Sequence, residues 1–359
     1  MPKNLYDLIL KQQHRVEARA NALADEMLAA LEGARESLTS QLTSLQVRFL
    51  TARPWEEESL SRKKAFLEAQ RQEVNRIISE VYESKAPAVL SAAQDTMAYV
   101  QSETASHSLA NRINFELGSP RLDLATVQAW TEATTVEGLT INEWLTRMAG
   151  HTADKIVQAG REAIIQGMTV QKTAQLLRQR GIEGTQPQVE SLARTYLLSA
   201  SNYAREQSVE ALGVDLDFQW LYVATLDGRT CLVCGADDGR IFKKTDKRPS
   251  LPRHINCRCV YVPVFGSGTL TSVNRAAVKH SGHTVHHRDG STSTKYSVES
   301  VDHVPAQESY AEWINRQVAE DPVFAREVLG KTRFDLLRKG EITLKRMVVD
   351  GRIRKLSDL

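Results

Sequence analysis

Apolar residues in the first third of the chain recur at the three- and four-residue spacing of amphipathic helices. The residues at this spacing are Leu38, Leu42, Leu45 and Phe49 in a first run and Leu67, Val74, Ile77 and Val81 in a second. The dipeptide Arg53-Pro54 separates the two runs, and Lys85-Ala86-Pro87 and Gly118-Ser119-Pro120 supply further helix breaks. We therefore predict a helical arm or bundle over residues 1–120, with its polar face in solvent.

The middle of the chain changes from helical spacing to the alternation that is typical of short strands. Residues 122–213 predict shorter helices, punctuated by Gly138, Gly150, Gly160, Gly167, Gly181 and Gly184. From Asp217 onward, the segments FQWLYVAT, GRIF and CVYVPVF are rich in β-branched and aromatic residues and predict three short strands. These elements together form the predicted second domain, residues 121–265.

The rest of the chain predicts a linker followed by a tail. Residues 266–305 are rich in Gly, Ser, Thr and His without a sustained period, which is typical of a flexible, exposed linker. Residues 306–359 predict a basic helical tail, whose first helix begins near Ser309 and places Tyr310, Trp313, Ile314 and Val318 on one face. The expected fold is therefore mainly α, with a small α+β C-terminal lobe.

Composition narrows the class of protein. The chain has 359 residues, of which 42% are hydrophobic and 25% charged, as in ordinary globular domains, so its core needs no disulfides. The N-terminus becomes charged before any apolar run reaches signal-peptide length, and no later run has the ~18 apolar residues of a membrane span. We therefore expect neither secretion nor membrane insertion. A net charge of +2 does not by itself indicate nucleic-acid binding.

The four cysteines lie close together and form two pairs of metal-binding type. Cys231 and Cys234 form a Cys-x-x-Cys pair, Cys257 and Cys259 form a Cys-x-Cys pair, and His254 stands three residues before Cys257. A Cys-x-x-Cys turn directs two thiolates at one tetrahedral ion, and a second segment completes the four ligands. The pattern predicts one structural zinc ion per chain, held either by all four cysteines or by three cysteines and the histidine.

Other interpretations of the cysteines fit the sequence less well. Zinc is favoured over an iron–sulfur cluster because the chain offers one compact tetrahedral set without a further cysteine motif. Disulfides are disfavoured because synthesis in a reducing cytosol would keep the thiols free. A catalytic zinc would need an open position and a carboxylate base, for which Asp237 and Asp238 qualify only by proximity.

The residues around the cysteines resemble the signature of the Mu F-like phage head morphogenesis family. That signature joins an Asp-x-Arg-Thr-Cys-x-x-Cys element to a His-x-Asn-Cys-Arg-Cys element. The matching positions are Asp227, Arg229, Thr230, Cys231, Cys234, Gly239, His254, Asn256, Cys257, Arg258, Cys259 and Pro263. About a dozen positions agree in order, which is far more specific than a bare Cys-x-x-Cys pair.

The resemblance extends on both sides of the cysteines, over roughly Ala125 to Leu359. The segment SLARTYLLSASNYARE is similar to the helix that precedes the family motif, although Tyr196 stands where the family has a glutamate. Downstream, SYAEWINRQ, EVLGKTRFDLLRKGEITLKRMV and the final LSDL resemble a tail found in many members. The helical arm before Ala125 carries no family signal.

The resemblance implies a minor capsid protein of a tailed bacteriophage. Family members are few-copy components of the virion that bind the portal protein inside the head and act in head assembly and in DNA packaging or ejection. The resemblance thus implies assembly in the host cytoplasm and the virion as final location, with the portal, a scaffold or the major capsid protein as candidate partners. We expect no membrane partner for the folded protein in the head.

Two basic segments suggest an alternative function. In it, the protein binds DNA non-specifically and is ejected with the genome. The first surrounds the cysteines and consists of Arg240, Lys243, Lys244, Lys247, Arg248, Arg253 and Arg258, opposed by Asp246. These side chains are candidates for contact with double-stranded DNA or with the portal. The second is the tail from Arg326 onward, with more basic than acidic residues.

An enzymatic role is the third hypothesis, because some family members are fused to toxin or nuclease domains. The region beyond Phe265 is short and shows no His/Asp/Glu set at catalytic spacing. We therefore expect no enzymatic activity and name no catalytic residue.

Overall fold

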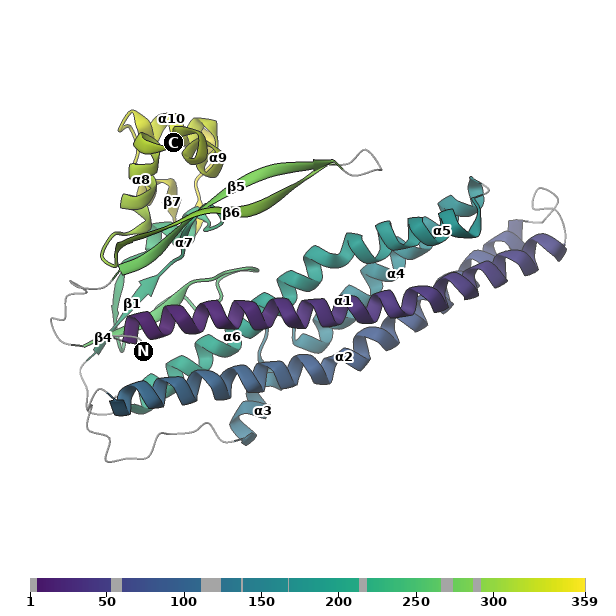
Figure 1. Cartoon of the computed structure of the whole chain (residues 1–359), viewed down its shortest axis with the longest axis horizontal. Coiled ribbons are helices and arrows are strands. Elements are labelled where there is room, and N and C mark those ends of the chain that lie inside the picture. The colour runs from purple at the N-terminus through teal and green to yellow at the C-terminus, as the bar shows by residue number, and fades with distance from the viewer. Residues whose placement is uncertain are drawn as a thin grey trace.

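The computed structural model describes residues 5–52, 60–110, 124–136, 138–166, 168–212, 218–265, 274–286 and 292–358. It shows an elongated helical body with a smaller α/β lobe at one end (Figure 1). The described residues are mainly helical, and the strands among them all follow α6 (Gln186–Leu212). The predicted class, mainly α with a small α+β C-terminal lobe, is confirmed.

Six α-helices build the helical body around one core. The long helices α1 (Leu5–Ala52) and α2 (Leu60–Ala110) lie side by side, and α3 (Leu124–Ala133), α4 (Ile141–Ile165), α5 (Val170–Leu177) and α6 pack along them (Figure 1). One continuous cluster of buried residues contains Leu31 of α1, Met97 of α2, Ile156 of α4 and Leu197 of α6. The helices on both sides of residue 120 therefore share a core, and the predicted arm does not pack separately from the next helices.

Several predicted helix breaks do not interrupt the helices. Pro87 lies inside α2, so the break expected at Lys85-Ala86-Pro87 is wrong. Gly150 and Gly160 lie inside α4. Buried side chains on both sides of Pro87, among them Tyr82 and Val89, keep α2 packed on its neighbours and offset the missing backbone donor. The breaks expected at Arg53-Pro54, Gly118-Ser119-Pro120 and Gly167 fall outside the described residues.

Two glycines do mark special positions in the helical body. Gly138, at φ 80°, forms the turn between α3 and α4. After α5 come a π-helical turn, η2 (Arg178–Ile182), and a 3₁₀ turn, η3 (Glu183–Thr185). A Cβ on Gly181 would approach Cγ1 of Ile156 to 2.4 Å, so this glycine lets the turn pack closely on α4. Gly138 and Gly181 therefore lie between helices as expected, because the backbone turns at the first and packs closely on α4 at the second.

The three predicted strands around the cysteines are confirmed and form one antiparallel sheet in the order β3-β1-β4. Strand β1 (Phe218–Val223) lies between β3 (Ile241–Lys243) and β4 (Val260–Phe265), with Trp220 opposite Phe242 and Pro263. One face carries Trp220, Tyr222 and Tyr261 toward the cysteines. The other face packs Leu221 and Val262 against the first turn of α1, where Ile9 is fully buried. The sheet thus joins the cysteine segment to the helical body.

The predicted linker over residues 266–305 is wrong for its described residues, which form a long β-hairpin. Strands β5 (Asn274–His286) and β6 (Thr292–Pro305) pair antiparallel, and β5 also pairs with the short β2 (Leu226–Asp227). The hairpin extends away from the lobe (Figure 1). Its Ser, Thr and Gly content hides the strand signal, because the stabilising hydrogen bonds come from a partner strand rather than from apolar alternation.

The predicted tail is a folded part of the lobe. The helices α8 (Tyr310–Glu320), α9 (Pro322–Leu329) and α10 (Lys331–Arg338) are followed by η4 (Leu344–Met347), β7 (Val348–Val349), β8 (Arg352–Ile353) and η5 (Leu356–Asp358). As predicted, the first helix begins at Ser309, which forms a capping box with Glu312. A buried cluster joins Trp313 and Met347 to Leu226 and Leu232 beside the cysteines. The tail and the cysteine segment therefore fold against each other.

The contact between this tail and α7 (Leu232–Asp237) requires a glycine. A Cβ on Gly235 would lie 2.4 Å from Cδ1 of Tyr310, which is fully buried. The Tyr310 hydroxyl donates to the carbonyl oxygens of Asp227 at 3.2 Å and Thr230 at 3.4 Å. Tyr310 thus anchors α8 against the turn that carries the first cysteine pair.

A buried ion pair holds the two sheets and α8 together. Asp238 and Arg275 are both almost fully buried, with Nη1 of Arg275 3.0 Å from Oδ2 of Asp238. The same carboxylate accepts the backbone N–H of Ala224 at 2.7 Å and of Tyr310 at 2.6 Å. Because every carboxylate oxygen has a donor, this pair fixes the end of β1, strand β5 and the start of α8 relative to one another.

No helix among the described residues has the length and apolar character needed to cross a membrane. This finding concerns those residues only.

Replacing Pro87 by alanine should stabilise the protein. Pro87 is exposed inside α2, so the change loses no core packing and gives the helix back a backbone donor. Proline costs a helix interior about 3 kcal/mol relative to alanine, and we expect a gain of about 1–3 kcal/mol in unfolding free energy. Urea titration followed by circular dichroism measures it. Ala88→Gly, at the neighbouring position, should destabilise, and a lower midpoint for Pro87→Ala would contradict the assignment.

Candidate metal centre

The first cysteine pair is placed by a turn that Asp227 organises. Oδ1 of Asp227 accepts the backbone N–H groups of Arg229 and Thr230 at 3.0 Å each and the Thr230 hydroxyl at 3.1 Å. This turn leads into α7, which Cys231 caps by accepting the N–H of Cys234 on its sulfur at 3.4 Å. Because both cysteines belong to one helical turn, their sulfurs lie on the same side of the segment.

The second segment brings His254 to this pair. Nε2 of His254 lies 3.2 Å from Sγ of Cys231 and 3.3 Å from Sγ of Cys234. On the other side of the ring, Nδ1 donates to the carbonyl oxygen of Ile255 at 2.8 Å. This bond fixes the ring and directs Nε2 at the sulfurs, which is the usual arrangement of a metal-binding histidine.

All five predicted ligands meet in two overlapping groups. The ligand atoms of Cys231, Cys234 and His254 lie within 4.8 Å of one another, and so do those of Cys234, Cys257 and Cys259. Cys234 belongs to both groups. Sulfur and imidazole donors at this spacing suit a tetrahedral ion with short bonds, so the residues fit a zinc-type ion.

The electrostatics of the site also fit a cation. Contact with Cys234, followed by contact with His254, lowers the pKa of the Cys231 thiol to about 4. Contact with Cys231 raises the pKa of His254 to about 9, although burial opposes the rise. The hydrogen bond to Cys231 and then those to Cys257 and Cys259 raise the pKa of Cys234 far above its ordinary value, because the packed sulfurs cannot all be anionic together. A bound cation would replace the shared protons and relieve this repulsion.

A buried ion pair between motif residues joins the two cysteine segments. Nη2 of Arg258 donates to Oδ1 of Asp227 at 2.8 Å, Nη1 contacts Oδ2, and the side chains are 8% and 1% exposed. The backbone carbonyl of Arg258 accepts a hydrogen bond from Gln13 of α1 at 2.9 Å. Asp227 and Arg258 therefore have a structural role, because each neutralises the buried charge of the other.

Asn256 docks the histidine segment onto α6. The backbone of Asn256 has φ 62°. Its N–H donates to Oγ1 of Thr195 at 2.9 Å, and its side-chain Nδ2 donates to Oγ of Ser191 at 2.9 Å. Its Oδ1 accepts a hydrogen bond from Nη1 of Arg194 at 2.8 Å. No role for these three α6 residues is predicted from the sequence, because the spacing of residues in α6 cannot show a contact with a loop about sixty residues away. The only signal was their place in the helix that resembles the family's.

Tyr196, where the family has a glutamate, belongs to the core of the body. It is 1% exposed, and its ring centroid lies 5.7 Å from that of Trp130. Its side chain is therefore part of the helical packing rather than of the metal centre.

The predicted basic cluster does not form one free surface. The members that pair inside the protein are Arg258 with Asp227, Arg253 and Arg240 with Asp237, and Arg248 with Glu206. The guanidinium of Arg248 also lies over the rings of Trp220 at 4.8 Å and Tyr261 at 4.9 Å. The exposed lysines are Lys243, Lys244 and Lys247. Charge counted along the sequence therefore overstates the charge available to a partner.

The two carboxylates considered as catalytic bases are engaged elsewhere. Asp237 pairs with Arg240 and Arg253, and Asp238 pairs with Arg275. Neither is a member of the two ligand groups.

Replacing Asp227 by asparagine should strongly destabilise the lobe. The change leaves Arg258 buried without a counter-charge, which costs about 3–5 kcal/mol for a pair of this kind. Chemical unfolding of the metal-loaded protein measures the loss. Asp246→Asn is the matched control, because Asp246 is exposed and its carboxylate accepts only a turn N–H, from Lys243. Equal midpoints for the two variants would show that the buried pair does not hold the segments together.

One family model matches the part of the chain that contains this candidate centre. Residues 154–262 match the family model described as "Phage Mu protein F like protein", which confirms the resemblance over a narrower range than Ala125 to Leu359. No curated protein and no solved structure matched the chain. The matched segment contains α6, strands β1 and β3, the first half of β4 and all five candidate ligands. The candidate metal centre therefore lies within the part of the chain that matches the phage Mu protein F-like model.

Proposed function

We propose that the chain is a minor head protein of a tailed bacteriophage, with a structural rather than an enzymatic role. The observation that carries the proposal is that residues of the family motif bind other groups of the protein and so hold the fold together. Within it, Asp227 and Arg258 pair with each other, Asn256 binds α6, and His254 contacts the first cysteine pair. Residues kept for catalysis would instead face a cleft with unpaired polar groups.

The metal in this proposal is one structural zinc ion per chain. Cys231, Cys234 and His254 supply three ligands, because they already lie in contact, and Cys257 or Cys259 closes the tetrahedron. The ion would supply folding energy by joining α7 to the segment before β4. Burial of Cys234, Cys257 and Cys259 supports a closed, structural shell.

Metal analysis of the purified protein tests this centre. Elemental analysis should give about one zinc per chain, and Cys231→Ser and His254→Ala should each lower zinc content and the unfolding midpoint. The same measurement on Cys257→Ser and Cys259→Ser identifies the fourth ligand, because only one of them should lose zinc as fully as Cys231→Ser. His303→Ala, a histidine in β6 outside both ligand groups, is the control. A folded wild-type protein without metal would overturn the assignment.

The proposed place of the protein is inside the head at the portal vertex, after assembly in the host cytoplasm. The portal protein is the proposed partner, with the scaffold or major capsid protein as further candidates, and the proposed action is in head assembly and DNA packaging or ejection. Support comes from the family match over residues 154–262.

Copurification tests the proposed place. A tagged chain expressed during phage growth should copurify with the portal protein and be found in proheads and virions. Cys234→Ser should reduce its incorporation, because Cys234 belongs to both ligand groups. Absence of the wild-type chain from purified heads would refute the proposal, whatever its metal content.

A role in DNA binding draws less support from the geometry. In the basic segment near the cysteines, all four arginines pair with acidic residues, whereas Lys243, Lys244 and Lys247 are exposed. In the tail, Lys345, Arg346, Arg352, Arg354 and Lys355 are exposed, so a weak and salt-dependent contact with DNA is compatible with the proposed place beside the genome.

A further inference from the structure

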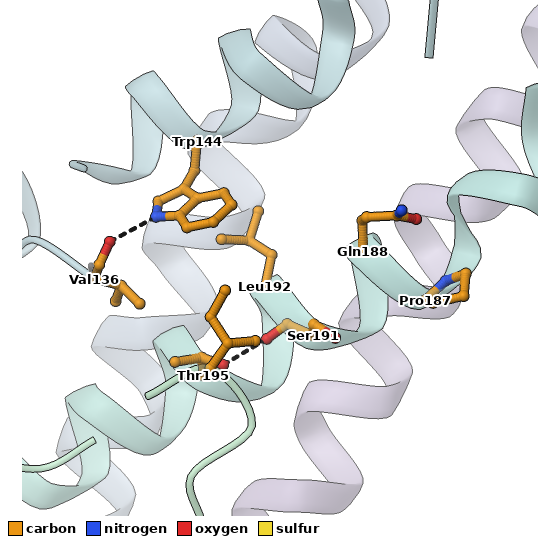
Figure 2. A pocket seen from close by; sticks show the side chains of 8 residues that line it. Val136, Trp144, Pro187, Gln188, Ser191, Leu192 and Thr195 are labelled. Carbon is orange, nitrogen blue, oxygen red and sulfur yellow. Dashed lines mark hydrogen bonds between the residues drawn. The ribbon is translucent and has the colours of Figure 1, made fainter. Parts of the chain in front are cut away.

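The two sides of the candidate metal centre differ in their access to water. A pocket of about 210 Å³ borders the segment that carries His254, because the next residue, Ile255, lines this pocket together with Trp144 (Figure 2). On the side of the β3-β1-β4 sheet, the candidate ligands are buried instead, and these are Cys234, Cys257 and Cys259. Protein groups rather than water must therefore stabilise the charge of these sulfurs when they are thiolates.

Tyr222 of β1 approaches the buried sulfurs from the sheet. It is fully buried and belongs to the same cluster of packed residues as Cys234 and Cys259. The register of the sheet places Tyr222 opposite Tyr261, and Cys259 stands two residues before Tyr261, where β4 begins. Residues two apart in a strand share a face, so Cys259 and Tyr222 lie on the same side of the sheet.

The hydroxyl group of Tyr222 lacks a partner in hydrogen-bonding geometry within the part of the chain that the structure describes. It is also out of contact with water, although a buried tyrosine hydroxyl usually forms a hydrogen bond. A buried polar group without a partner destabilises a fold, so this hydroxyl is expected to serve a group beside it.

The charged neighbours of this hydroxyl identify its acceptor. Burial, and then the negative charge of nearby thiolates, raises the pKa of Tyr222 far above its ordinary value, so the phenol keeps its proton. Those thiolates are, in decreasing order of effect, Cys259, Cys234 and Cys257. Arg253 also lies near the hydroxyl. A guanidinium can only donate hydrogen bonds, so among these neighbours the sulfurs alone can accept the phenol proton.

We propose that Tyr222 is a positioning residue of the metal centre, which donates a hydrogen bond to the sulfurs of Cys234 and Cys259 when they bind the ion as thiolates. The inference rests on the proposed function, because it concerns the same zinc centre. Metal binding removes the thiol protons, and a hydrogen bond to an ionised acceptor is stronger than one to a neutral acceptor. Tyr222 thus orients the ligand sulfurs, lowers their charge density and strengthens metal binding.

Removal of the hydroxyl tests this role in the full-length chain, with Co²⁺ as a spectroscopic substitute for zinc. Tyr222→Phe should shift the sulfur-to-cobalt charge-transfer band to longer wavelength, because a thiolate without its hydrogen bond gives up electron density more easily. Zinc affinity, measured by competition with a chelator, should fall about 10–100-fold. A loss of packing alone would not shift the band in this direction.

Tyr261→Phe is the matched control. Tyr261 is buried on the same face of the sheet, but its hydroxyl donates to the carbonyl oxygen of Pro249 at 2.7 Å. This variant should keep the wild-type band and zinc affinity, whatever its unfolding midpoint. An unchanged band in Tyr222→Phe, or an equal shift in both variants, would overturn the proposal.

A stronger donor at the same position gives an independent readout. A fluorinated tyrosine at position 222 has a more acidic hydroxyl and should shift the band to shorter wavelength. Because it keeps both the ring and the hydroxyl, it decides the question even if Tyr222→Phe does not fold. A shift to longer wavelength, or none, would contradict a hydrogen bond from this hydroxyl to the sulfurs.

The two proposals fail differently. If the wild-type chain binds both ions and Tyr222→Phe matches it in band and affinity, the role of Tyr222 fails while the metal centre stands. If the folded wild-type chain binds neither ion, the metal centre fails, and the role of Tyr222 fails with it.

Discussion

The lobe depends on the buried pair between Asp227 and Arg258. It connects the turn before the first cysteine pair to the segment between the second pair, and it leaves both charges without water. A buried pair of this kind adds little net stability compared with apolar residues, but it allows only one arrangement of the two segments because any other leaves a charge unpaired. In that arrangement, the five candidate ligands form two overlapping groups.

The candidate metal centre lies at a junction of three parts of the chain. Asn256 binds α6, Gln13 of α1 binds the carbonyl of Arg258, and Tyr310 packs on Gly235 of α7. The β3-β1-β4 sheet adds a second link, since one of its faces covers the cysteines and the other packs on α1. An ion at this place would hold the helical body, the sheet and the C-terminal helices together. This is a structural task, and it explains why so many motif residues bind other protein groups.

The arginines near the cysteines show how charge counted along a sequence overstates the charge that is left for a partner. Seven basic residues between Arg240 and Arg258 resemble a site for phosphates. Instead, Arg248 lies over two aromatic rings and pairs with Glu206, and Arg253 pairs with Asp237. Arginine suits such positions because its planar group can pair and stack at once. The partners lie on other elements, so only the fold reveals them.

The sequence by itself determined the helical class, the three strands near the cysteines, the helix that starts near Ser309 and the set of five candidate ligands. These follow from local periodicity, capping and spacing, which act over a few residues. Tertiary structure alone decided that α2 continues through Pro87, that residues 274–305 include a hairpin, and that His254 faces Cys231 and Cys234. Each of these depends on partners distant in the sequence, and the packing or hydrogen bonds that they supply outweigh the local preference of the chain.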